Sequence, residues 1–147
     1  YPRQGTRMST EPEQGRAPER ASLAVDPACV GFGPAAAGFV TFLPHRDNPP
    51  KDEFNVRAIF DNDRGAIDDC DIVVANLNGI ITDDGTAWEL GYAFAKGKYL
   101  VGLHTDWRRR FDHEVVNLMM ECSLDRLVRS LDELRVVLRE FAAGRVA

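Results

Sequence analysis

The sequence lacks several features that would place it in a specialised class. No apolar run approaches the roughly 18 residues of a membrane-spanning helix, and the N-terminus lacks the apolar stretch of a secretory signal. The 3 cysteines are widely spaced and form no Cys-x-x-Cys motif, which argues against a disulfide framework or a zinc site. Basic residues, 18 against 23 acidic ones, are too few for a typical nucleic-acid-binding face. We therefore expect a cytoplasmic protein with no metal or other cofactor, no membrane contact and no nucleic-acid partner.

The length of 147 residues suits one domain of ordinary size. Residues 1–28 are rich in Pro, Gly, Arg, Glu and Ser and show neither strand nor helix periodicity. This composition predicts a flexible N-terminal tail. Residues 29–147 are expected to form a single domain.

The domain alternates between strand and helix patterns. Strands are expected over residues 38–43, 71–77 and 99–104, and helices over residues 52–69, 85–97 and 131–141. The run 71–77 is almost continuously apolar, which indicates a strand buried on both faces of a parallel sheet. The last helix follows Ser130, which forms a capping-box pattern with Glu133. These patterns predict an α/β layer fold with right-handed connections.

The start of the domain does not fit this alternation. A possible strand over residues 29–32 is separated from the strand beginning at Phe39 by about six residues. A crossover between parallel strands needs a dozen residues or more. The N-terminal βα unit is therefore expected to be atypical or missing.

Carboxylates are the chemically informative side chains. Ligands of open parallel sheets bind beyond the carboxyl ends of the strands, which directs attention to residues 44–51, 78–85 and 104–117. Asp83 and Asp84 stand at a predicted helix start, where either could simply be the N-cap. Glu89 lies one turn further, among apolar, small and aromatic neighbours. A lone acid in such a helix is a candidate catalytic group.

Together with Asp63, these residues could supply an acid, a base, a nucleophile or metal ligands. The spacing of an EF-hand calcium loop is absent. Retaining glycosyl transfer uses one carboxylate to attack the anomeric carbon while a second group protonates the leaving group. The cluster suits that reaction, although its spacing alone leaves the other roles open.

Three segments resemble the nucleoside 2-deoxyribosyltransferase family. They are residues 70–79, the Asp-x5-Glu-Leu-Gly segment that begins at Asp83, and Asn-Leu-Met at 117–119, within a resemblance over residues 38–141. The resemblance implies a flavodoxin-like (Rossmann-like) three-layer fold with a parallel sheet. It also implies that Glu89 attacks C1′ of a 2′-deoxynucleoside and forms a covalent deoxyribosyl ester. A second base would then resolve the ester, with net retention.

The same resemblance assigns the remaining site residues. Asp63 would contact the base and transfer a proton, and Asp83 would bind sugar hydroxyls. Asn117 would be contributed by a neighbouring subunit, with Met119 as a wall of the shared site. The expected partners are small-molecule deoxynucleosides and nucleobases, and the expected assembly is a homo-oligomer with shared active sites.

Two other functions remain open from the sequence. A related class of N-hydrolase cleaves deoxynucleoside 5′-monophosphates, but it has Ser at the position of Asp83. A carboxylate there would repel a 5′-phosphate, which favours unphosphorylated nucleosides. A non-catalytic nucleoside-binding module is the second alternative, because the N-terminal unit is irregular and a fold does not fix a function.

Overall fold

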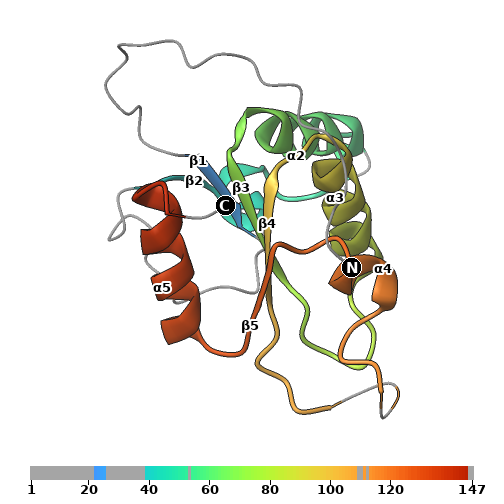
Figure 1. The fold of residues 1–147 in the computed structure, drawn as a ribbon. Helices are drawn as coiled ribbons and strands as arrows, with labels where there is room; N and C mark the ends of the chain where they lie inside the picture. Colours follow the sequence, from blue (N-terminus) through green and yellow to red (C-terminus); the bar gives the residue numbers. More distant parts are fainter. Residues whose placement is uncertain (1–21, 26–38, 53, 109–110, 112, 146–147) are drawn as a thin grey trace.

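The computed structural model describes residues 22–25, 39–52, 54–108, 111 and 113–145. The described strands form one parallel five-stranded sheet with the order β2-β1-β3-β4-β5 (Figure 1). The strands are β1 (Ser22–Val25), β2 (Val40–Phe42), β3 (Ile72–Asn76), β4 (Tyr99–Leu103) and β5 (Arg126–Val128). The helices are α1 (Pro44–Asp47), α2 (Val56–Asp69), α3 (Asp84–Ala95), α4 (Leu118–Glu121) and α5 (Leu131–Ala142). This strand order is that of flavodoxin-like folds, so the predicted fold class is confirmed.

The position of β1 corrects the expectation for the N-terminus. Ser22–Val25 lies within the segment predicted to be a tail, yet it pairs with both β2 and β3 inside the sheet. The first strand is therefore present rather than missing. Its place also resolves the spacing problem, because residues 26–39 are long enough for a parallel crossover. The possible strand at 29–32 lies outside the described residues, as does the rest of the predicted tail.

The predicted central strands are confirmed. Ile72 pairs with Tyr99 and Asn76 with Leu103, so β3 and β4 run in register over their whole length. Four consecutive residues of β3 are buried, as its continuous apolar run predicts. Gly102 of β4 is needed for close packing, because a Cβ atom there would lie 2.6 Å from Cδ1 of Leu124 and 2.7 Å from Cδ1 of Leu77.

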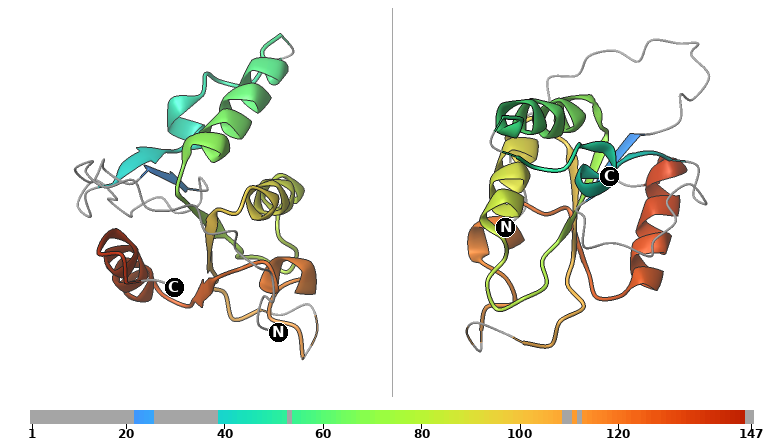
Figure 2. Two further views of the ribbon diagram at one scale, coloured as in Figure 1. Left: turned by 45° about the horizontal axis from the view of Figure 1, so that its top comes forward. Right: turned by 180° about the vertical axis from the view of Figure 1, so that it is seen from behind.

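Helices cover both faces of the sheet. The apolar side of α5, with Leu134 and Leu138, packs on one face against Val74 and Val101. On the other face, α2, α3 and α4 pack through apolar residues that include Leu90. Figure 2 shows α5 separated by the sheet from α3 and α4. In the described part of the chain, no helix is long and apolar enough to cross a membrane.

The sequence patterns missed three short elements, α1, α4 and β5. The helices α1 and α4 have 4 residues each and β5 has 3, too few to show a period of 3.6 or 2. Their positions depend on tertiary contacts: β5 exists through its pairing with β4. The C-terminal helix was predicted correctly, and Ser130 accepts the expected hydrogen bond from the Glu133 backbone at 3.1 Å.

Candidate active site

The two predicted catalytic carboxylates lie in one pocket. Asp63 of α2 and Glu89 of α3 both line a cavity beside the ends of β2 and β3, which we call the carboxylate pocket. Its other lining residues are Phe42, Pro44, Ile67, Val73, Val74, Ala75, Thr86 and Leu90. The two acids are far apart in sequence, and the packing of α2 against α3 on one face of the sheet brings them together.

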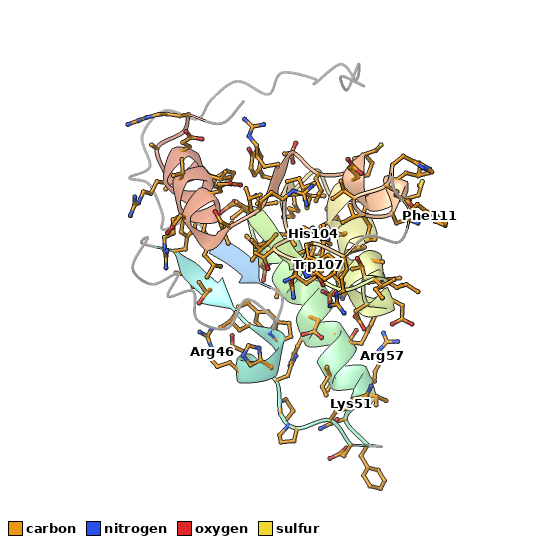
Figure 3. The ribbon with its side chains drawn as sticks, turned by 90° about the horizontal axis from the view of Figure 1, so that it is seen from below. Arg46, Lys51, Arg57, His104, Trp107 and Phe111 are labelled. Atoms are coloured by element: carbon orange, nitrogen blue, oxygen red, sulfur yellow. The ribbon has the colours of Figure 1, made fainter. Side chains whose placement is uncertain are left out.

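Figure 3 views this edge of the molecule from below, toward the carboxyl ends of the strands. The labelled Arg46 marks α1, which lies beside α2. His104 and Trp107 mark the end of β4. The pocket lining includes Phe42 at the end of β2 and Ala75 near the end of β3, so the pocket lies where ligands bind in open parallel sheets.

Asp63 is half-buried and hydrogen-bonded. The Nδ2 atom of Asn48 donates to its Oδ1 at 2.6 Å. Burial raises the pKa of the Asp63 carboxyl above its ordinary value, and the hydrogen bond from Asn48 opposes part of that shift. A raised pKa favours the neutral acid, which is the form that can give a proton to a leaving group.

Glu89 lies on the inner side of α3. The residues one turn before and directly after it, Thr86 and Leu90, are buried and line the same pocket. Trp88 instead stacks on Tyr92 at 5.3 Å between ring centroids and contacts Phe60 of α2. The helix thus separates its aromatic side, which packs against α2, from the side that presents Glu89 to the pocket.

Asp83 is the N-cap of α3, the alternative that the sequence left open. Its Oδ2 accepts hydrogen bonds from the backbone nitrogen of Thr86 at 3.0 Å and from Thr86 Oγ1 at 3.4 Å. Asp83 itself is exposed and lines neither of the two cavities described here. Its contact with the carboxylate pocket runs through Thr86, which forms part of the pocket wall.

Asn117 and Met119 lie in a second cavity. Asn117 caps α4, with its Oδ1 accepting from the Met119 backbone nitrogen at 3.0 Å. Both residues line a wide apolar depression between α3 and α4, which we call the α3–α4 groove. Leu90 lines both cavities, so the groove and the carboxylate pocket adjoin at this buried side chain. Within one chain, Asn117 and Met119 are therefore not in the same cavity as Asp63 and Glu89.

The groove exposes several large apolar side chains. Met119 is 74% exposed, Ile81 71% and Ile80 56%, and Phe94 of α3 is also exposed. These side chains all line the same groove. Clustered exposed apolar residues of this kind mark contact surfaces or ligand sites.

Sequence reasoning missed three polar residues near the site. Asn48 contacts Asp63, and Asn78 binds the loop after β4 through Thr105 at 2.9 Å. Asp106 accepts a hydrogen bond from the Gly79 backbone at 3.2 Å. Arg108 beside Asp106 holds the pKa of that carboxyl well below its ordinary value. All lie in the three loops beyond the carboxyl ends of the strands that the sequence analysis named, but only the fold shows which partners these residues contact.

No group of three or more His, Cys, Asp or Glu side chains among the described residues is arranged to hold a metal ion. The candidate site contains two carboxylates from adjacent helices at the carboxyl edge of a flavodoxin-like sheet. The fold and this pocket define the chain as a flavodoxin-like α/β protein with a carboxylate pair at the ligand-binding edge of its sheet.

Comparison with known proteins identifies the family within this class. The profile described as "Nucleoside 2-deoxyribosyltransferase" matches residues 29–121, so the chain belongs to the nucleoside 2-deoxyribosyltransferase family. No curated protein sequence matches the chain. This membership confirms the family resemblance drawn from the motifs.

Solved structures share the fold. A conserved protein from Enterococcus faecalis V583 superposes with a TM-score of 0.64 at 20% identity, over 82% of this chain and 99% of that one. A 2-deoxyribosyltransferase from Bacillus psychrosaccharolyticus gives 0.58 at 23% identity, over 80% and 96%. A CMP N-glycosidase from Clostridium botulinum gives 0.48 at 16% identity, over 82% and 98%. The family match supports an enzyme that acts on nucleosides, and the first two of these structures share the fold of this chain.

Proposed function

We propose that the protein transfers a 2-deoxyribosyl group from one nucleobase to another through a covalent ester at Glu89. The observation that carries the proposal is the placement of Asp63 and Glu89 in one pocket at the carboxyl edge of the sheet. The raised pKa of Asp63 supports its assignment as the acid of the pair. Such a reaction would serve nucleoside salvage in the cytoplasm.

In the first step, an ionised Glu89 oxygen forms a bond to C1′ of the deoxynucleoside. The bond from C1′ to the base nitrogen breaks, and its electron pair goes to the base. Asp63 gives its proton to the departing base, because a nucleobase anion is a poor leaving group. The products are a neutral free base, a deoxyribosyl ester of Glu89 and an ionised Asp63.

In the second step, the incoming base forms a bond from its ring nitrogen to C1′. The ester bond breaks, its electron pair returns to the Glu89 carboxylate, and Asp63 takes up the proton that the incoming base loses. Each step inverts C1′, so the product has the configuration of the substrate. Both carboxyl groups return to their starting protonation states without any cofactor.

Substrate binding completes the proposal. Asp83 binds sugar hydroxyls through the oxygen not engaged in its two contacts to Thr86. Asn117 and Met119 serve the pocket of a neighbouring copy. In their own chain they line the α3–α4 groove and not the carboxylate pocket. The exposed apolar side chains of that groove support a homo-oligomer with active sites at its subunit boundaries.

Base exchange tests this function directly. The protein is incubated with deoxyinosine and cytosine, and the products are separated by chromatography. New deoxycytidine supports the transferase. Free hypoxanthine with deoxyribose but no deoxycytidine would instead identify an N-glycosidase. Unchanged substrates would favour a non-catalytic nucleoside-binding module.

The role of Glu89 has its own test. Glu89→Ala should abolish exchange while circular dichroism and nucleoside binding remain close to those of the unmodified protein. Mass spectrometry of the unmodified protein with deoxyinosine alone should show an added deoxyribosyl group that is absent from Glu89→Ala. Glu140→Ala is the matched control, because Glu140 is exposed on α5 across the sheet. Exchange at near normal rate in Glu89→Ala would exclude the ester.

A further inference from the structure

Asn48 is anchored beside two residues of the carboxylate pocket, Pro44 and Asp63. It is the C-cap of α1, and its backbone nitrogen donates to the Pro44 carbonyl at 3.1 Å. Pro44 itself lines the pocket. The backbone of Asn48 is thus fixed relative to the pocket wall, and its side chain reaches from α1 to α2.

The orientation of the Asn48 amide follows from its two partners. Its Nδ2 donates to Asp63 Oδ1 at 2.6 Å, and its Oδ1 accepts from Asn62 Nδ2 at 3.3 Å. An amide nitrogen only donates and an amide oxygen only accepts. With the Asn62 amide donating to the oxygen side, the N–H side of Asn48 faces the carboxyl of Asp63.

This contact distinguishes the two oxygens of Asp63. Because Asn48 Nδ2 donates, Oδ1 of Asp63 must accept, and a proton on Oδ1 would compete for the same direction. In the neutral acid, the proton is therefore favoured on Oδ2. A general acid is effective only when its proton is held within reach of the atom that receives it.

We propose that Asn48 is a positioning residue that holds Asp63 by Oδ1 and so assigns the transferable proton to Oδ2. This inference rests on the proposed function, in which Asp63 protonates the leaving base. It extends that function by assigning the positioning of the Asp63 carboxyl to a neutral amide rather than to a cation. A Lys or Arg at the same place would favour the ionised carboxylate and reduce the supply of protons.

The charged groups around Asp63 are consistent with this assignment. On α1, the Arg46 guanidinium binds Asp47 at 2.6 Å. On α2, Arg64 binds Asp68 at 3.0 Å. On α3, Glu89 lines the same pocket as Asp63. The nearby arginines are therefore engaged with other carboxylates, and an amide contact leaves Asp63 able to remain neutral next to an ionised Glu89.

A leaving-group comparison separates positioning of the acid from simple support of the pocket. Deoxyguanosine needs a proton on its departing base, whereas 7-methyl-2′-deoxyguanosine already carries a positive charge on its base and leaves without one. Asn48→Ala should lower kcat/KM for deoxyguanosine by about 10- to 100-fold, because mispositioning the acid loses part of the roughly 100- to 10,000-fold that general acid catalysis contributes. For the methylated substrate, the loss should stay within about threefold, since no proton transfer is needed.

Asn55→Ala is the matched control. Asn55 also bonds through its side chain, to the Pro50 carbonyl and the Asp52 backbone, but neither of these partners lines the pocket. Asn55→Ala should leave the ratio of kcat/KM for deoxyguanosine to kcat/KM for the methylated substrate unchanged. If Asn48→Ala does not fold, Asn48→Leu removes the amide donor at similar volume and without adding a charge, and it should show the same selective loss.

If Asn48→Ala loses kcat/KM equally for both substrates, or for neither, the proposed role of Asn48 is overturned. Base exchange by the unmodified protein would still support the proposed function. Failure of the unmodified protein to cleave either nucleoside would instead overturn the proposed function, and the role of Asn48 with it. The two failures are distinguished by the unmodified protein alone.

Discussion

The Oδ1 atom of Asn78 accepts hydrogen bonds from the backbone nitrogens of Thr105 at 2.8 Å and Asp106 at 3.0 Å. Its Nδ2 atom donates to Thr105 Oγ1 at 2.9 Å. One side chain therefore ties the loop after β3 to the loop after β4. The first loop leads to α3 with Glu89 and the second leads toward Asn117, so this contact links the two parts of the chain that carry the proposed site.

Asn78→Ala removes all three of these hydrogen bonds. We expect the free energy of unfolding to fall by about 1–3 kcal/mol, because two backbone N–H groups lose their acceptor. Urea denaturation followed by circular dichroism measures the change. Thr105→Val, which removes only the hydroxyl contact, should cost about 1 kcal/mol or less. Equal stability of Asn78→Ala and the unmodified protein would show that water replaces the contact.

The raised pKa of Asp63 predicts a pH dependence of stability. Because burial raises this pKa in the folded state, the fold favours the neutral carboxyl. Its contribution is fully present below the ordinary aspartate pKa and is lost as the pH rises through the raised folded value. The side chain of Asp63→Asn cannot ionise. As the pH rises from the ordinary aspartate pKa through the raised folded value, the unmodified protein should therefore lose stability relative to Asp63→Asn.

Denaturation at several pH values measures that difference. Asp61→Asn is the control in the same helix, where Asp61 pairs with Arg57 at 2.9 Å. This control should not reproduce the Asp63→Asn profile. A constant difference between Asp63→Asn and the unmodified protein at all pH values would contradict the raised pKa.

Asp83→Ser separates the capping role of Asp83 from its proposed role in substrate binding. Serine is also a good N-cap, so the free energy of unfolding should change by less than about 1 kcal/mol. Activity on deoxyadenosine should fall, because a sugar-binding acceptor is lost. The preference for deoxyadenosine over its 5′-monophosphate should narrow by about three- to fivefold, the size of an exposed charge interaction. The measurement is kcat/KM for both substrates, and an unmodified protein that uses them equally would contradict this role.

Met119→Asp tests the α3–α4 groove as a contact between copies. A carboxylate at this exposed apolar position should weaken association by about tenfold or more, since an unpaired charge would be buried at the interface. Light scattering over a concentration series measures the assembly, and activity should fall with it. Val136→Asp on α5 makes the same change at a 51% exposed position across the sheet and should have no such effect. A fully active monomer of the unmodified protein would contradict shared active sites.

Local sequence was enough to name the candidate residues of the site, whose roles stay predictions. The motif that begins at Asp83 places Glu89 one to two turns into α3, because helical geometry fixes that spacing. The family resemblance added Asp63, whose place in the carboxylate pocket is now seen. The separation of Asn117 from that pocket could not be read from local pattern, since it depends on how α4 packs beside α3.

The sequence by itself determined the elements with strong periodic or continuous apolar patterns. The strands β3 and β4 and the helices α2, α3 and α5 follow from residues close together in the chain. The existence of β1 was decided by the tertiary structure alone. Ser22–Val25 is a four-residue strand that is identified only by its pairing with β2 and β3. It also decided the contact of Asn48 with Asp63 and that of Asn78 with Thr105. These polar side chains have no periodic signal, because their partners lie on other elements that only the packing of the sheet and helices brings within hydrogen-bonding distance.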